Sequence, residues 1–200
     1  MAKPIDFYFD FSSPYGYIAG EKIDALAAKH GRSVDWKPIL LGAIFKVTGG
    51  QPMPMIPLKG DYAKRDFLRS AAFHGVKFKY PSTFPISGVA PVRAVIWQKA
   101  TDPAKAGALA RALYRAYFTE DVNISDAENV VKVAASTGLD ADAVRAGMND
   151  QATKDRAKAG VDAAIAAGVF GSPYMVIDGE PFWGVDRLDQ MERWLSKGAW

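Results

Sequence analysis

The protein has 200 residues, 49% of them hydrophobic and 24% charged, which is ordinary for a globular domain with a substantial core. Its net charge of +3 is too small to indicate a nucleic-acid partner, and the absence of cysteine excludes disulfides, thiolate metal sites and a protein thiol nucleophile. The sequence has no signal-peptide segment and no apolar stretch of the roughly 18 residues that a membrane helix needs, so we expect a cytoplasmic protein without a membrane partner.

The first forty residues alternate between strand and helix patterns. Apolar and polar residues alternate over residues 5–11, which predicts a strand with its three phenylalanines on one face. Helix-like spacing follows over residues 14–30, with Ser13 as the expected N-cap and Pro14 in the first turn. Residues 33–40 predict a second strand. This β-α-β order is the unit that makes parallel strands.

The middle of the chain is dominated by helical patterns. Residues 40–62 are rich in glycine and proline and predict a loop or a broken helix. Amphipathic segments then follow one another as far as Gly168. Within them, residues 125–128 form a capping-box pattern, which predicts the start of a helix.

The last part of the chain returns to strands. Residues 173–179 and 180–184 predict two short strands that Asp178 and Gly179 join in a hairpin. A final amphipathic helix follows over residues 186–200. The order is therefore β-α-β, a helical block, then β-β-α.

This order resembles a thioredoxin-like α/β fold, and the large all-helical insertion between its halves resembles DsbA-like proteins. We expect a thioredoxin-like domain formed by residues 1–42 and 165–200 and a helical insertion domain formed by residues 43–164. Four segments carry a closer resemblance: "DFYFDFSSPYGY", "LLGAIFKVTG", "KYPSTFP" and "VFGSPYMVIDGEPFWGVDRL". Together they resemble the 2-hydroxychromene-2-carboxylate isomerase and kappa-class glutathione transferase family, from Ile5 to about Trp194.

The resemblance implies glutathione as the cofactor. It implies that Ser13 contacts the sulfur of glutathione, with Pro14 and Tyr15 in the same loop. It also implies that Ser172, before a cis Pro173, pairs through its backbone with the cysteinyl part. The residues expected near the γ-glutamyl end and the rest of the cofactor are Trp183, Gly184, Val185, Asp186 and Lys59.

The chemistry of Ser13 is consistent with that role. A serine hydroxyl without a neighbouring base is a poor nucleophile, but it can donate a hydrogen bond to a thiolate from outside. The adjacent helix N-terminus adds partial positive charge, which lowers the pKa of a bound thiol. The alternative is that Ser13 serves only as an N-cap.

The other predicted site residues also have structural alternatives. A cis Pro173 leaves the preceding amide and carbonyl free for a ligand, whereas a plain turn proline would not. Amides at residues 184–186 suit a carboxylate, and Asp186 equally suits the N-cap of the final helix. Asp6 and Asp10 share one strand face, and we interpret them as structural because no third group accompanies them.

One loop departs from the family pattern. Relatives often carry Thr-Gly-Asn after the second strand, but here residues 48–51 read Thr-Gly-Gly-Gln. Gly50 therefore takes the place of the asparagine. Either Gln51 substitutes for it, or the contacts to the substrate differ in this protein.

The expected function is a glutathione-dependent cis-trans isomerase that acts on 2-hydroxychromene-2-carboxylate or a similar aromatic conjugated acid, by reversible thiolate addition and bond rotation. The alternatives are a kappa-type glutathione transferase that conjugates electrophiles and a non-catalytic DsbA-like binding protein. We expect a homodimer, and no metal site, since no His, Asp and Glu cluster has ligand spacing. The residues expected to line the substrate space, besides Trp183, are Phe45, Lys46, Tyr62 and Phe84.

Overall fold

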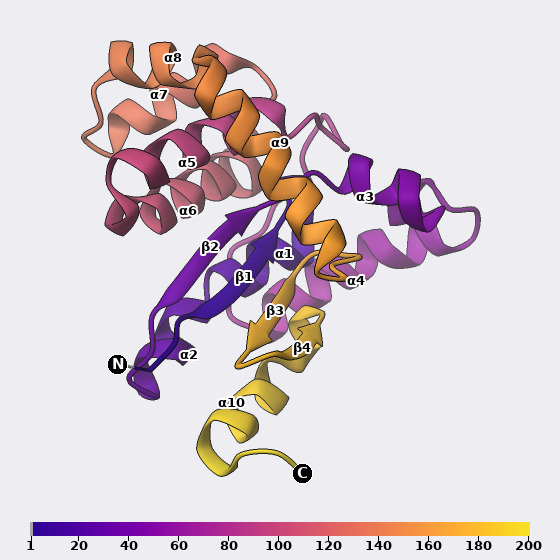
Figure 1. The fold of residues 1–200 in the computed structure, drawn as a ribbon. Coiled ribbons are helices and arrows are strands. Elements are labelled where there is room, and N and C mark those ends of the chain that lie inside the picture. Colours follow the sequence, from indigo (N-terminus) through magenta and orange to yellow (C-terminus); the bar gives the residue numbers. More distant parts are fainter. Residues whose placement is uncertain (1) are drawn as a thin grey trace.

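A computed structural model describes residues 2–200, and a four-stranded sheet forms their centre (Figure 1). The strands are β1 (Ile5–Phe9), β2 (Val34–Pro38), β3 (Tyr174–Ile177) and β4 (Glu180–Trp183), in the spatial order β2-β1-β3-β4. β1 runs parallel to β2 and antiparallel to β3, and β3 and β4 form a hairpin. The predicted β-α-β and β-β-α halves therefore join in one mixed sheet.

The helical pattern after Ser13 forms two helices, α1 (Pro14–Gly20) and α2 (Ile23–Lys29), and not one. The break follows from the amide of Lys22, which donates to the carbonyl of Ala19, three residues back, at 2.9 Å. Such a bond tightens the turn and ends the regular α-helix.

Helices fill most of the chain between β2 and β3. The segment 40–62, predicted as a loop or broken helix, contains α3, a short 3-10 helix η1 and the first residues of α4. The remaining elements are α3 (Leu41–Thr48), η1 (Met53–Met55), α4 (Lys59–Phe73), α5 (Val89–Thr101), α6 (Pro103–Glu120), α7 (Ala127–Ser136), α8 (Ala141–Asn149), α9 (Gln151–Ala166), the 3-10 helix η2 (Val185–Arg187) and α10 (Leu188–Lys197).

Figure 1 shows α5 to α8 gathered as one group, with α9 running from that group back toward the sheet. Ala71 of α4 belongs to the same core cluster as Phe9 and Tyr114 of α6, so α4 and α6 share one face of the sheet. Ile44 of α3 packs with Tyr8 and with Ala164 of α9 on the other face, and α10 lies at the C-terminal end. Among residues 2–200, no helix is both long and apolar enough to cross a membrane. The division into a thioredoxin-like and an insertion domain stays a prediction.

The core confirms the predicted strand faces. Phe7, Phe9 and Phe11 are 0% exposed, and the rings of Phe9 and Phe11 lie 5.6 and 5.0 Å from that of Tyr114 on α6. Trp36 of β2 packs edge-on against Phe9 at 5.2 Å. Aromatic pairs at these separations add to the stability that burial provides. They hold the end of β1 against the helical insertion.

Two turns test the predicted local signals. The hairpin is confirmed, because Asp178 and Gly179 both have positive φ angles, 53° and 97°, as a tight β-hairpin turn requires. The capping box is wrong in detail, since Asp126 and not Ser125 caps α7, accepting from the amide of Glu128 at 2.8 Å. Ser125 instead bonds to the side chain of Asn123 at 2.6 Å, which occupies its hydroxyl.

Candidate active site

A pocket of about 1460 Å³ opens beside the end of β1, bordered by α3, the start of α4 and the turn before η2. The structure brings every predicted cofactor and substrate residue to its wall. These residues are Ser13, Pro14, Tyr15, Phe45, Lys46, Lys59, Tyr62, Phe84, Ser172, Pro173, Trp183, Gly184, Val185 and Asp186.

Ser13 lies at the strand-to-helix junction and is only 6% exposed. Its hydroxyl oxygen accepts a hydrogen bond from the amide of Gly16 at 3.0 Å, which confirms the predicted N-cap of α1. The same hydroxyl donates to the carbonyl oxygen of Ser172 at 2.9 Å. The hydroxyl of Ser13 is therefore already hydrogen-bonded on both sides.

The peptide bond between Ser172 and Pro173 is cis, as predicted. The expectation that both backbone groups before Pro173 are free is wrong for one of them, because the carbonyl of Ser172 accepts from Ser13. The amide of Ser172 donates to no residue between 2 and 200. The side chain of Ser172 is held in place, since its oxygen accepts from the amide of Asp10 at 3.0 Å.

Gly16 occupies the fourth position of the junction, where a Cys-x-x-Cys protein carries its second thiol. A Cβ atom on Gly16 would lie 2.7 Å from the Ser172 oxygen and 2.8 Å from the Tyr114 hydroxyl, both too close. The Tyr114 hydroxyl donates to the carbonyl of Asp10 at 2.8 Å. Burial raises the pKa of Tyr114 well above its usual range, with the charge of Asp10 adding to the effect, so the phenol stays neutral. The hydroxyls of Ser172 and Tyr114 thus fill the space that a second thiol would need.

Asp10 was interpreted from the sequence as structural, but it also lines the pocket, 4% exposed. Its carboxylate accepts from the amides of Ser12 and Leu41, each at 2.7 Å. Burial raises its pKa to about 6, although the two amides act in the opposite direction. Because Leu40 offers no side-chain cap to α3, Asp10 supplies the acceptor for the first amide of that helix.

Tyr15 ties the junction to α4. Its hydroxyl donates to the carboxylate of Asp66 at 2.5 Å, and Asp66 is also paired with Arg69. Burial first, and then the bond to Asp66, raise the pKa of Tyr15 above its usual value. Burial alone would raise the pKa of Asp66, but hydrogen bonds from Tyr15 and Arg69 lower it. No local sequence signal marks Asp66 as a partner of Tyr15, because the two residues lie on different helices, 51 positions apart.

The turn after β4 differs from the prediction. Asp186 is not an N-cap, because the chain first makes the 3-10 turn η2 and α10 begins only at Leu188. The side chain of Asp186 instead pairs with Arg187 at 2.9 Å. Gly184 has a φ of 107°, which lets the chain turn back while its amide donates to the carbonyl of Pro173 at 3.0 Å.

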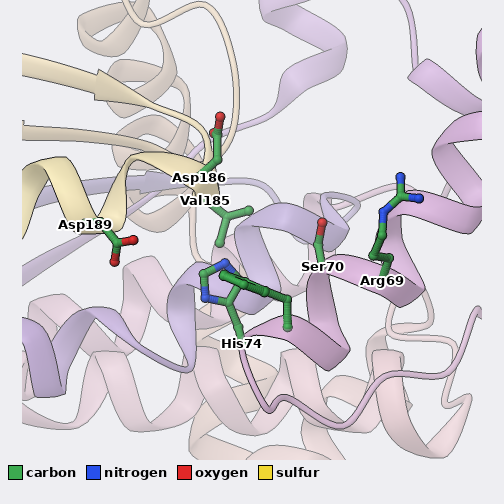
Figure 2. A pocket seen from close by; sticks show the side chains of 7 residues that line it. Arg69, Ser70, His74, Val185, Asp186 and Asp189 are labelled. Carbon is green, nitrogen blue, oxygen red and sulfur yellow. The ribbon is translucent and has the colours of Figure 1, made fainter.

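A second, smaller pocket of about 410 Å³ lies between α4 and the segment that forms η2 and the start of α10 (Figure 2). Ser70, Val185 and Asp186 line both pockets. The smaller one is also lined by Arg69, Phe73, His74 and Asp189. Burial, and then the charge of Lys22, lower the pKa of His74, so it is largely neutral at pH 7.

Two lysines, Lys46 on α3 and Lys59 at the start of α4, lie on another part of the wall of the larger pocket. Within residues 2–200 no carboxylate lies at ion-pair distance from Lys46 or Lys59, whereas the nearby Lys64 pairs with Asp61. The position of the family asparagine is partly filled, because a Cβ on Gly50 would lie 2.7 Å from the ring of Phe45. No group of His, Cys, Asp and Glu placed to hold a metal occurs in the part of the chain that the structure describes.

A family model described as a DSBA-like thioredoxin domain matches residues 4–196. The chain belongs to this family. The match spans the sheet and the helices between its halves, which confirms the predicted thioredoxin-like fold with a DsbA-like helical insertion.

Relatives within the family agree with the predicted resemblance. The chain is 32% identical over 199 residues to a 2-hydroxychromene-2-carboxylate isomerase of Sphingobium xenophagum, covering 98% of this chain and 99% of that protein. It is 26% identical to glutathione S-transferase kappa 2 of Caenorhabditis elegans, covering 98% and 92%. A solved structure of 2-hydroxychromene-2-carboxylate isomerase superposes with a TM-score of 0.85 at 27% identity, covering 96% and 94%.

Proposed function

We propose that the protein is a glutathione-dependent cis-trans isomerase acting on 2-hydroxychromene-2-carboxylate or a similar aromatic conjugated acid. The observation that carries the proposal is the meeting of the Ser13 hydroxyl and the Ser172 backbone on the wall of a large pocket, in a chain without cysteine. A hydroxyl and a peptide edge in this arrangement suit a thiol that comes with its own peptide backbone. The isomerase relatives support the choice of reaction.

The residues present fit glutathione. The amide of Ser172 lacks a partner within residues 2–200 and is available to a peptide-like ligand, and the Ser13 hydroxyl donates to the carbonyl of the same residue. The pocket of about 1460 Å³ exceeds the roughly 300–1,000 Å³ of an ordinary ligand site, which leaves room for an aromatic acid beside the cofactor. The residues that would hold glutathione are Ser13, Pro14, Tyr15, Lys59, Ser172, Pro173, Trp183, Gly184, Val185 and Asp186.

When bound, glutathione supplies a thiolate that adds reversibly to a conjugated C=C bond and so permits rotation about it. The protein stabilises the negative sulfur with the Ser13 hydroxyl, a hydrogen bond that is strong because one partner is charged. Lys46 meets the carboxylate of the substrate, and the rings of Phe45, Tyr62 and Phe84 pack against its aromatic part. Holding both reactants in one pocket lowers the entropic part of the barrier.

A kappa-type transferase is the second candidate, because the kappa relatives match over nearly the whole chain. The two activities differ in the fate of glutathione. An isomerase regenerates it, whereas a transferase consumes it and accumulates a conjugate.

The test mixes the protein with glutathione and 2-hydroxychromene-2-carboxylate and follows the isomer together with free glutathione. We expect isomer to form without loss of glutathione. Accumulation of a conjugate with a halogenated aromatic, without isomerisation, would establish the transferase instead. Absence of glutathione binding in calorimetry would reduce the protein to a non-catalytic DsbA-like binding protein. The cytoplasmic location and the homodimer stay predictions, for cell fractionation and light scattering to test.

A further inference from the structure

The hydroxyl of Ser13 has a single proton, and that proton is already in use. It points to the carbonyl of Ser172 at 2.9 Å, while the oxygen accepts from the amide of Gly16 at 3.0 Å. A hydroxyl stabilises a thiolate only by donating that proton to the sulfur. The arrangement in the structure is therefore not the one that binds a thiolate.

We propose that the Ser13 hydroxyl exchanges its acceptor on ligand binding, leaving the Ser172 carbonyl for the sulfur when an amide N–H of the ligand takes its place on that carbonyl. This rests on the proposed glutathione-dependent function. The ligand class that satisfies the exchange is a thiol with an N–H on the carbon next to its CH₂–S group, as in a cysteinyl peptide.

Neighbouring groups hold the heavy atoms of Ser13 and Ser172 in place, so only the hydroxyl proton of Ser13 moves in the exchange. The oxygen of Ser13 is held by the Gly16 amide and is buried, so the O–H bond turns while the oxygen stays in place. The position of Ser172 is fixed because its side-chain oxygen accepts a hydrogen bond from the amide of Asp10. The hydroxyls of Ser172 and Tyr114 fill the space beneath Gly16, where an added Cβ would lie 2.7 and 2.8 Å from them, so this side of the junction is closely packed.

The exchange makes the ligand amide part of thiolate stabilisation. If Ser13 turns to the sulfur and nothing replaces it on Ser172, a carbonyl covered by ligand is left without a donor, which is unfavourable. A thiol without the amide N–H therefore shows a smaller fall in its pKa on binding, by about one to two units. The proton of the thiol itself leaves to the solvent, and the Ser13 proton remains on its oxygen throughout.

The experiment compares two ligands on the wild-type protein. One is glutathione, and the other is its analogue with an ester oxygen in place of the γ-glutamyl-cysteine amide nitrogen. Calorimetry measures the binding of each, and thiolate absorbance against pH gives the pKa of each bound thiol relative to the same thiol free in solution. We expect both to bind, with the pKa of the ester analogue falling by about one to two units less.

The variant Ser13→Ala adds a second readout, because it removes the proton that exchanges. In that variant we expect the two ligands to show equal pKa shifts. Equal shifts on the wild-type protein would overturn the exchange while leaving the glutathione-dependent function intact. If glutathione itself does not bind, the proposed function fails and the exchange fails with it.

Discussion

Two walls of the large pocket differ in how completely their polar groups are paired. The serine wall, formed by residues 10–16 and 172–173, is buried and densely bonded. Its hydroxyls, amides and the Asp10 carboxylate bond to one another across these two segments, at 2.7 to 3.0 Å, and Asp10 also accepts from the amide of Leu41 in the neighbouring wall. Such a network fixes the position of each group in it.

The lysine wall, formed by residues 41–62, has few such bonds. The N-cap residues of α3, η1 and α4 make no side-chain capping bond, and the first amide of α3 instead donates to the side chain of Asp10. Leu58, before α4, is 96% exposed with a φ of 67°, and Tyr62 is 62% exposed. Elements with few buried contacts open at lower free-energy cost than a packed core.

The difference matches two tasks in the proposed function. Stabilising a sulfur requires one donor in one place, and the serine wall supplies it by holding the Ser13 oxygen on the Gly16 amide. Accepting an aromatic acid of variable shape requires apolar side chains and charges that can adjust, which the lysine wall supplies. Variants on the two walls should therefore have different effects.

The largest effect is expected for Ser13→Ala. Removing the side-chain donor that we propose for the sulfur should lower kcat with glutathione by about 100-fold, the usual cost of a lost donor to a developing anion. Steady-state kinetics measures it. The variant also loses the N-cap of α1, so Asp140→Ala, which removes the cap of the distant helix α8, serves as the control for stability alone. Similar activity in both variants would show that Ser13 is only a cap.

Asp10 should give the serine wall a distinct pH dependence. Burial raises its pKa to about 6 in the folded protein from the ordinary 3.8 of an aspartate, so the folded state binds the proton more tightly. Its contribution to stability is therefore full below pH 3.8 and is lost as the pH rises through about 6, a change of about 2 to 3 kcal/mol. Urea unfolding of wild type and Asp10→Asn from pH 4 to 7 measures it.

The variant Asp10→Asn loses one acceptor at every pH, so only the change of the stability difference with pH is informative. We expect wild type to lose stability relative to the variant over this window. A difference that does not vary with pH would mean that Asp10 ionises normally.

Alanine substitutions at Gly16 and Gly42 compare how tightly the two walls are packed. Gly16→Ala places a methyl group 2.7 Å from the Ser172 oxygen and should lower the free energy of unfolding by about 1 to 3 kcal/mol. Gly42→Ala on α3 meets nothing within 4 Å and should be neutral or gain up to about 1 kcal/mol. Denaturant unfolding measures both. Equal stabilities would show that the serine wall relaxes as easily as the lysine wall.

The sequence predicted those features of the serine wall that depend on neighbouring residues. The Ser13 cap, the alternation of β1 and the Asp178–Gly179 turn each depend on a few consecutive residues, and each is confirmed. Local signals failed where a second polar residue competed or the chain turned earlier. Asp126 replaced Ser125 as a cap, and the η2 turn displaced Asp186.

The contacts that join distant segments had no local signature. Asp10 reaches the amide of Leu41, and Tyr15 reaches Asp66, across 31 and 51 residues. The bond from Ser13 to Ser172 spans 159 residues. The family resemblance predicted which residues meet at the pocket, but only the structure shows that Ser13 already has an acceptor.

The smallest effect is expected for the lysine wall. Lys46→Gln and Lys59→Gln each remove one unpaired positive charge near the proposed place of an anionic ligand. An exposed charge contact contributes up to about 1 kcal/mol, so each variant should raise KM by up to about fivefold with little change in kcat. Kinetics at low and high salt measures this, since screening should reduce the difference.

The matched control is Lys64→Gln, which removes the same charge from α4 outside the pocket and breaks only the pair with Asp61. Its KM should equal that of wild type. Varying glutathione and the aromatic acid separately assigns each lysine, because a change in KM for one reactant alone identifies the anion that the side chain meets. If Lys46→Gln lowers kcat and leaves both KM values unchanged, Lys46 acts on the reaction itself, and the lysine wall is then not confined to binding.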